Sequence, residues 1–181
     1  MIQKQFQEQL AADFSSNHDR LAAVARPLDP ERLLRPPAPG RWSVGQVLEH
    51  LALMDGLFLS ATEPLVHGAR PDAAAPLREW KPSFIGGQIA GALVKPKPLR
   101  SARVGAPGTP RNGVTEAYLA IDRRYQQLLK EAAPLDWNAV RLRPPVLPWL
   151  PLKINLGDVF QIHRVHVRRH LQQIERTIAA L

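Results

Sequence analysis

Three of the six histidines lie close together in one stretch of the sequence, residues 155–178. The stretch reads NLGDVFQIHRVHVRRHLQQIERTI, and neither proline nor glycine interrupts it after Gly157, which favours one long helix. It contains His163, His166 and His170. His166 and His170 are four residues apart, so on a helix their rings project from one face, one turn apart. Two imidazoles at this spacing can bind one metal ion.

Helix geometry limits which of these histidines could share an ion. His163 and His170 would be about 10.5 Å apart along a helix axis, whereas two nitrogens on one metal are only about 3–3.5 Å apart. The candidate pairs are therefore His166 with His170, or His163 with His166. A further ligand should come from a neighbouring helix, and His50 is the candidate there. The alternative is a hydrogen-bonded polar core, because a buried imidazole needs partners for its nitrogens.

Apolar residues at helical spacing predict the elements that would position these histidines. The four long helices expected span residues 3–25, 43–66, 114–133 and 155–178. Ser43 with Gln46 forms a capping-box pattern, and Asn155 is the expected cap of the last helix. A short helix is expected at 84–94 and no strand is predicted. The fold class expected is all-α, a four-helix bundle with long Pro-rich connections.

The length of 181 residues suits a single domain, residues 1–181. No cysteine is present, which excludes disulfides and thiol ligands. The short apolar runs and the polar N-terminus predict neither a membrane span nor a secretory signal, so a cytoplasmic protein is expected. The net charge is +8, but the basic residues are spread along the chain. Nucleic-acid binding is therefore not favoured.

Several other side chains have expected positions. Glu49 adjoins His50, but consecutive helical residues point about 100° apart, so Glu49 is expected at the surface. Gln173, one turn after His170, could orient a ligand. Trp149 and Leu150 are expected to be buried. The basic cluster of the last helix is also expected at the surface: Arg164, Arg168 and Arg169. The buried face of the helix at 43–66 is expected to include Leu57 and Leu65.

Two segments resemble the signature regions of the DinB-like (DinB/YfiT) superfamily. They are WSVGQVLEHLALMD, residues 42–55, and HVRRHLQQIERT, residues 166–177. The resemblance implies a four-helix bundle of up-down-down-up topology that binds a divalent metal through three histidines. Carried over by position, the metal ligands are His50, His166 and His170. His163 would then have a supporting role.

Three protein nitrogens leave coordination positions open, as in catalytic metal sites. Zn²⁺, Ni²⁺, Fe²⁺ or Mn²⁺ would suit imidazole ligands. The resemblance implies a thiol-dependent transferase or a hydrolase, with the metal activating a thiol cosubstrate or a water. The partners expected are a small-molecule substrate and a low-molecular-weight thiol. No catalytic residue and no organic cofactor is assigned, and exposed helix faces would suit a homodimer. The alternative is a non-catalytic helical bundle with a polar histidine core and a basic partner-binding surface.

Overall fold

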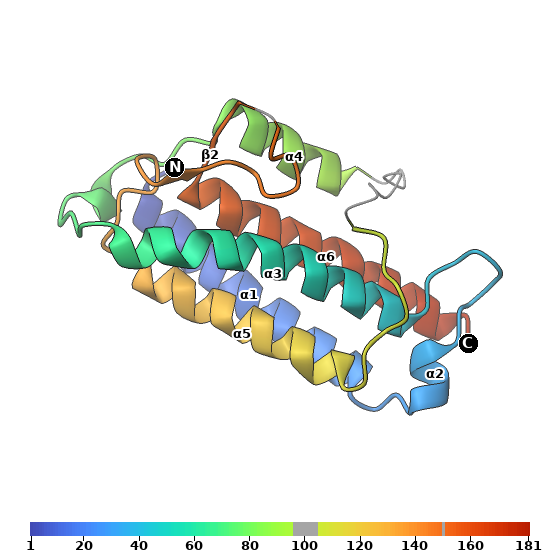
Figure 1. Cartoon of the computed structure of the whole chain (residues 1–181). Coiled ribbons are helices and arrows are strands. Elements are labelled where there is room, and N and C mark those ends of the chain that lie inside the picture. Colours follow the sequence, from blue (N-terminus) through green and yellow to red (C-terminus); the bar gives the residue numbers. More distant parts are fainter. Residues whose placement is uncertain (96–104, 150) are drawn as a thin grey trace.

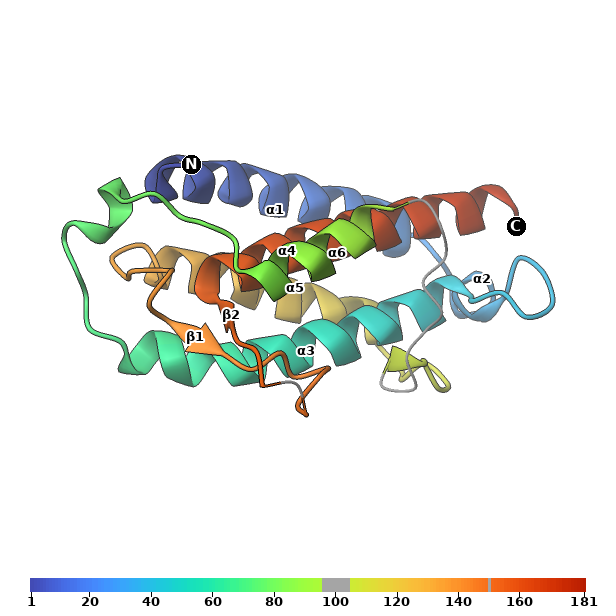
Figure 2. The ribbon, with the colours of Figure 1, turned by 90° about the horizontal axis from the view of Figure 1, so that it is seen from above.

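The computed structural model describes residues 1–95, 105–149 and 151–181, and it is mostly helical (Figure 1). Four long helices lie side by side, with α1 and α3 each packing against both α5 and α6 (Figures 1 and 2). Their bounds are Gln3–Ala25 for α1, Val44–Gly68 for α3, Val114–Glu131 for α5 and Leu156–Ala179 for α6. The shorter elements are α2 (Pro30–Leu34), the 3₁₀ turn η1 (Ala75–Leu77) and α4 (Phe84–Val94). The mostly helical chain and its four long helices are confirmed.

The two helices that carry the candidate ligands begin at the predicted caps. Ser43 Oγ accepts the Gln46 N–H at 3.2 Å, and Gln46 Oε1 accepts the Ser43 N–H at 3.0 Å. Asn155 and Asp158 exchange the corresponding two bonds at the start of α6, at 2.9 and 3.0 Å. These reciprocal bonds satisfy backbone donors that a helix start leaves without partners. They fix the register of α3 and α6.

A short strand pair corrects the expectation that the chain contains no strand. β1 (Arg141–Leu142) pairs antiparallel with β2 (Ile154–Asn155), immediately before α6. The Leu156 N–H donates to the main-chain oxygens of Trp137 and Val140, at 3.1 and 3.0 Å. The pair closes a Pro-rich connector back onto itself. At two residues a strand, it is too short for an alternating apolar pattern to indicate it.

The core fills the space between the four long helices. Its largest fully buried side chains are Trp137, Tyr118, Tyr125, Phe14 and Phe160. On α3 the prediction was wrong for Leu57 and Leu65, which are 43% and 36% exposed. Apolar residues occur on more than one side of α3, so periodicity alone does not separate its buried face from its exposed one.

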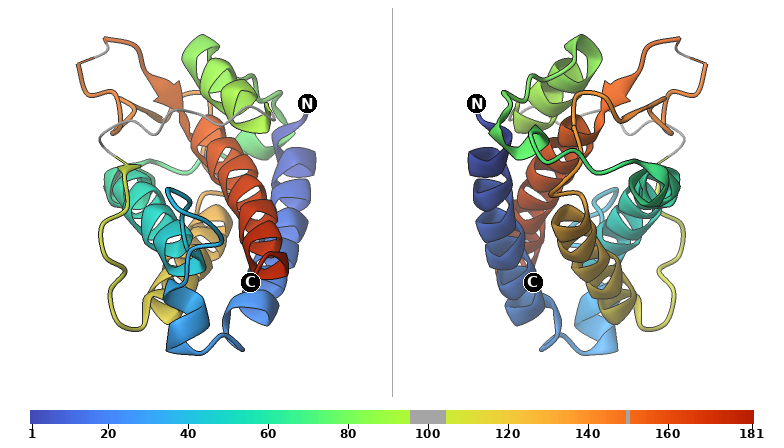
Figure 3. Two further views of the ribbon diagram at one scale, coloured as in Figure 1. Left: turned by 90° about the vertical axis from the view of Figure 1, so that its right-hand side faces the viewer. Right: turned by 90° about the vertical axis from the view of Figure 1, so that its left-hand side faces the viewer.

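The short helix α4 packs across α6 (Figure 3). Gly86 permits this contact, because a Cβ there would lie 2.2 Å from the Asp158 carboxyl carbon. Trp149 is 71% exposed, so its predicted burial was wrong: its connector projects away from the long helices (Figure 3). Leu150 lies outside the described residues.

Among the helices in the described ranges, none combines the length and apolarity needed to cross a membrane.

Candidate metal centre

Three histidines from two helices meet between α3 and α6. His50 lies on α3, while His166 and His170 lie one turn apart on α6. Each offers one ligand nitrogen, and the three nitrogens all lie within 4.8 Å of one another. The Nε2 atoms of His50 and His166 are 3.2 Å apart. His166 and His170 are each 7% exposed, so the cluster is largely buried.

The Nδ1 atom of each ring faces an oxygen of the protein. The three pairs are His50 with the Gly105 carbonyl at 2.5 Å, His166 with Asp55 Oδ1 at 2.8 Å, and His170 with Gln173 Oε1 at 2.9 Å. Carbonyl and carboxylate oxygens only accept hydrogen bonds, so each Nδ1 carries the hydrogen. In a neutral ring this leaves the Nε2 lone pair free to bind a metal. The predicted orienting role of Gln173 agrees with its contact to His170.

These lone pairs fit a shared cation. Two neutral rings whose Nδ1 atoms carry the hydrogens would direct Nε2 lone pairs at each other across 3.2 Å. That distance matches two nitrogens on one divalent ion. Burial, the largest cause, lowers the pKa of both His50 and His170. Both rings are therefore held in the neutral form that binds metals.

The family comparison supports the same region of the chain. Residues 13–174 match the family model of the DinB superfamily. The chain belongs to the DinB superfamily. The matched range contains His50, His166 and His170. Comparisons with curated proteins and with solved structures returned no match.

In this DinB protein a buried carboxylate supports the triad. Asp55, on α3 and 3% exposed, accepts the His166 N–H on Oδ1. Its Oδ2 accepts the Tyr118 hydroxyl at 3.0 Å, and its main-chain oxygen accepts the Tyr125 hydroxyl at 3.1 Å. Burial opposes ionisation, but the contacts with the His166 and His163 rings outweigh it and lower the Asp55 pKa. Asp55 therefore orients His166 as a carboxylate.

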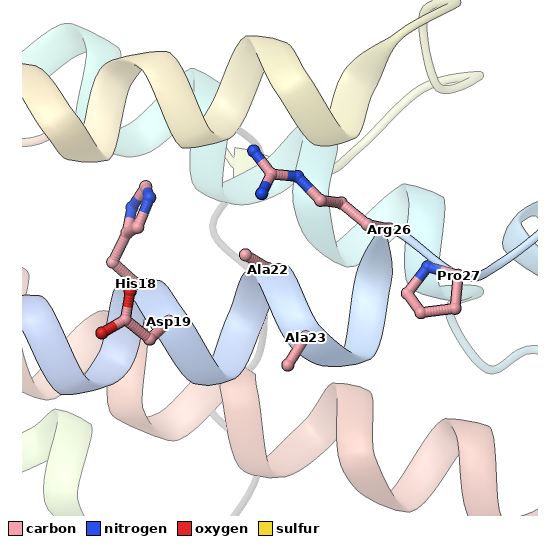
Figure 4. Close-up of a pocket in the computed structure, with 6 residues that line it drawn as sticks. All are labelled: His18, Asp19, Ala22, Ala23, Arg26 and Pro27. Atoms are coloured by element: carbon pink, nitrogen blue, oxygen red, sulfur yellow. The ribbon is translucent and has the colours of Figure 1, made fainter.

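His163 lies outside the triad but touches its support. Its Nδ1 is 3.2 Å from Asp55 Oδ2, and its Nε2 is 3.1 Å from Asp122 Oδ1. On the other side of Asp122, His18 Nδ1 contacts Oδ2 at 2.7 Å. The polar chain thus runs from His166 through the core to α1. It ends at an open pocket, where Figure 4 shows His18 and Arg26 reaching from α1 toward α5.

Sequence reasoning missed Asp122 and His18. Asp122 follows Tyr118 by four residues, and His18 follows Phe14 by four, so each lies on an apolar helical stripe. A polar residue in such a stripe is a usable signal, because burial is costly without a partner. The identity of the partner depends on how α1, α5 and α6 pack.

The segment that contacts His50 is attached to α3 by an ion pair. Arg111 Nε is 3.0 Å from both Glu49 carboxylate oxygens, and the Arg111 backbone N–H also donates to Glu49. Glu49 is 6% exposed, so its predicted surface position was wrong. The helix directs it away from His50 as expected, but the loop carrying Arg111 covers it. Gly105, in the same segment, packs closely against the His50 ring: a Cβ at Gly105 would be 3.1 Å from the His50 Cε1 atom.

An open cleft adjoins the triad on the α3 side. Its lining includes Arg41 and Trp42, which precede α3, Gln46 in the first turn of α3, and residues 108–110. The Trp42 and His50 rings are 5.2 Å apart between centroids.

In the basic cluster of α6, Arg164 pairs with Asp13 at 3.1 Å and Arg169 donates to the Leu93 and Lys95 carbonyls. These two arginines therefore make contacts within the protein.

Proposed function

We propose that this protein is a metal-dependent enzyme in which His50, His166 and His170 hold one divalent ion. The observation that carries the proposal is the 3.2 Å separation of two Nε2 atoms whose rings both direct Nδ1 at oxygen acceptors. A polar core would instead be expected to pair each lone pair with a donor. The chain's membership of the DinB superfamily supports the same conclusion.

The donor set indicates which ions would fit. Three neutral imidazoles suit Zn²⁺, Ni²⁺, Fe²⁺ or Mn²⁺, and three protein ligands leave a position for a small molecule. An ion held there would act as a Lewis acid that lowers the pKa of a water or a thiol. We propose thiol-dependent transfer or hydrolysis as the reaction class.

The chain's own residues would orient the ligands and receive the substrate. Asp55, the Gly105 carbonyl and Gln173 hold the three rings with Nε2 directed inward. The oxygens of Asp55 are already occupied, so we assign it to orientation and not to proton abstraction. The cleft beside Trp42 has a volume of about 670 Å³, which suits a small molecule. We propose it as the entry for the substrate or a thiol cosubstrate.

The arrangement of the helices supports the up-down-down-up four-helix-bundle topology that we propose for this domain. In Figure 1, the colour gradient runs in one direction along α1 and α6 and in the opposite direction along α3 and α5. The long connection between α3 and α5 is what a parallel pair requires. This topology brings α3 and α6 together, and with them the three histidines.

Two reactions would separate the proposed chemistries. Metal-stripped protein would be reloaded in turn with each of the four ions. It would then be assayed for conjugation of a small thiol to chlorodinitrobenzene and for hydrolysis of p-nitrophenyl acetate. We expect one activity to appear with metal and to be absent from His170→Ala. Activities that are the same with and without metal, in both assays, would contradict the proposal and favour a non-catalytic bundle with a polar core.

A further inference from the structure

His163 is a buried imidazole whose two nitrogens both face carboxylates. Nε2 is 3.1 Å from Asp122 Oδ1, and Nδ1 is 3.2 Å from Asp55 Oδ2. A neutral imidazole has one N–H, so one lone pair would face an ionised oxygen at contact distance. The His163 Nδ1 atom makes no hydrogen bond, so its contact with Asp55 Oδ2 is an electrostatic one. Two carboxylates at these distances therefore favour an imidazolium.

The surroundings of the ring favour this cation. The side chain is 1% exposed, and Tyr125 stacks on it with ring centroids 3.7 Å apart and planes inclined by 5°. The edge contact with Phe14, at 4.8 Å, is apolar. The charged and titratable groups that face it are Asp55 from α3, Asp122, Tyr118 and Tyr125 from α5, and His18 from α1 across Asp122. Two carboxylates thus surround one cation, and an aromatic face adds to its stabilisation.

The position of His163 connects this charge to the triad. The oxygen of Asp55 that contacts His163 is Oδ2, while Oδ1 accepts the His166 N–H at 2.8 Å. The Tyr118 hydroxyl provides the other contact to Oδ2. Removing the imidazolium would leave two buried carboxylates without the cation between them. Asp55 Oδ2 would then lose one of its two contacts and keep only the Tyr118 hydroxyl.

We propose that His163 is a positioning residue whose imidazolium, clamped between Asp55 and Asp122, holds Asp55 in the orientation that directs His166 Nε2 at the metal. This rests on the proposed metal site. His163 itself binds no metal, because its two nitrogens are occupied by the carboxylates. Its role is to fix the ligand geometry through a charged contact that crosses the core from α5 to α3.

The first test compares metal binding by full-length His163→Gln and wild type. Zn²⁺ affinity would be measured by competition with a chelator, and the Co²⁺ form would report ligand geometry through its visible spectrum. We expect on the order of a tenfold loss of affinity, as for other outer-sphere partners, and an altered Co²⁺ spectrum. His67→Gln, a surface histidine paired with Glu131, is the matched control and should leave both unchanged.

A double variant distinguishes charge from packing. His163→Gln with Asp122→Asn removes one cation and one anion together, so the net charge of the cluster is the same as in wild type. We expect it to recover much of the lost affinity, which a purely structural role of His163 does not predict. A double variant that binds more weakly than His163→Gln, or a single variant that matches wild type, would overturn the proposal.

Ring ¹⁵N NMR keeps the two proposals separable. In metal-free wild type at neutral pH, we expect His163 to carry protons on both nitrogens and His166 to carry one on Nδ1. In His163→Gln, the Nδ1 preference of His166 should weaken. If wild type binds no metal, the proposed function fails, yet these spectra still test whether a charged His163 holds Asp55 in place. A neutral His163, or an unchanged His166 in the variant, would refute it.

Discussion

The Nε2 atoms of His50 and His166 lie 3.2 Å apart, although 116 residues separate the two histidines in the sequence. Each ring is fixed from behind by an oxygen on Nδ1, so the short distance does not depend on the two rings bonding to each other. The distance matches that between two nitrogens bound to one divalent ion.

Asp55→Asn should weaken metal binding by about 10–100-fold, the usual effect of losing an outer-sphere partner. The amide would no longer provide the charge that His166 and His163 both face. Chelator competition would measure the loss. Asp136→Asn, which alters a partly exposed ion pair with Arg78, is the control. Equal affinities for the two variants would argue against a role for Asp55 in orienting His166.

Gly105→Ala should lower metal affinity by about tenfold. The added methyl would lie 3.1 Å from His50 Cε1 and 3.1 Å from Met54 Sδ, so the His50 ring must move. Gly108→Ala is a matched control in the same segment, because a methyl there meets nothing within 4 Å. Metal titration of both variants tests the contact. If the two substitutions have the same effect, the Gly105 carbonyl does not position His50.

Arg111→Ala should destabilise the fold by about 1–3 kcal/mol, because it leaves the buried Glu49 carboxylate without its cation and its side-chain donors. The Glu49 pKa, which Arg111 lowers, should rise. Denaturant unfolding measures the change. Arg26→Ala removes an ion pair whose two ends are both exposed, and it should have little effect. A larger loss of stability in Arg26→Ala than in Arg111→Ala would contradict the prediction.

His163 should make stability fall as the pH rises above neutrality. Burial opposes its charge, but Asp55 and Asp122 outweigh this and raise its pKa to about 9, against about 6.5 when unfolded. Because the folded pKa is the higher one, the contribution is complete below about pH 6.5 and is lost as the pH approaches 9. One such group changes stability by at most about 1.4 kcal/mol per pH unit. Urea unfolding between pH 6 and 9 should show a steeper decline in wild type than in His163→Gln. Parallel curves would contradict the prediction.

Local patterns account for the helices and for the ligand pair on α6. Capping residues and apolar spacing placed α3 and α6, and the i, i+4 rule placed His166 beside His170. His50 was identified because it lies within another helix's apolar pattern and within a recognisable family segment. The packing of α3 on α6 supplies the remaining geometry, which the spacing of residues along one helix does not contain.

The errors and omissions have a shared physical origin. Glu49 was expected in solvent because the helix turns it from His50, but a loop far along the chain brings Arg111 onto it. Asp122 and His18 are single polar residues within apolar stripes, and their partners come from other helices. Trp149 was expected to pack because of its type, whereas its connector projects outward. For the three polar residues the outcome depends on a contact between distant segments, and for Trp149 it depends on the path of its connector.

The metal content of the protein tests the central claim most directly. Protein purified without chelator or affinity metal would be analysed for Zn, Ni, Fe and Mn, together with His50→Ala and the surface control His67→Ala. We predict about one divalent ion per chain in wild type and in His67→Ala, and a large loss in His50→Ala. Wild-type protein that contains no metal and takes none up on addition, or a His50→Ala variant that retains the full content, would contradict this account.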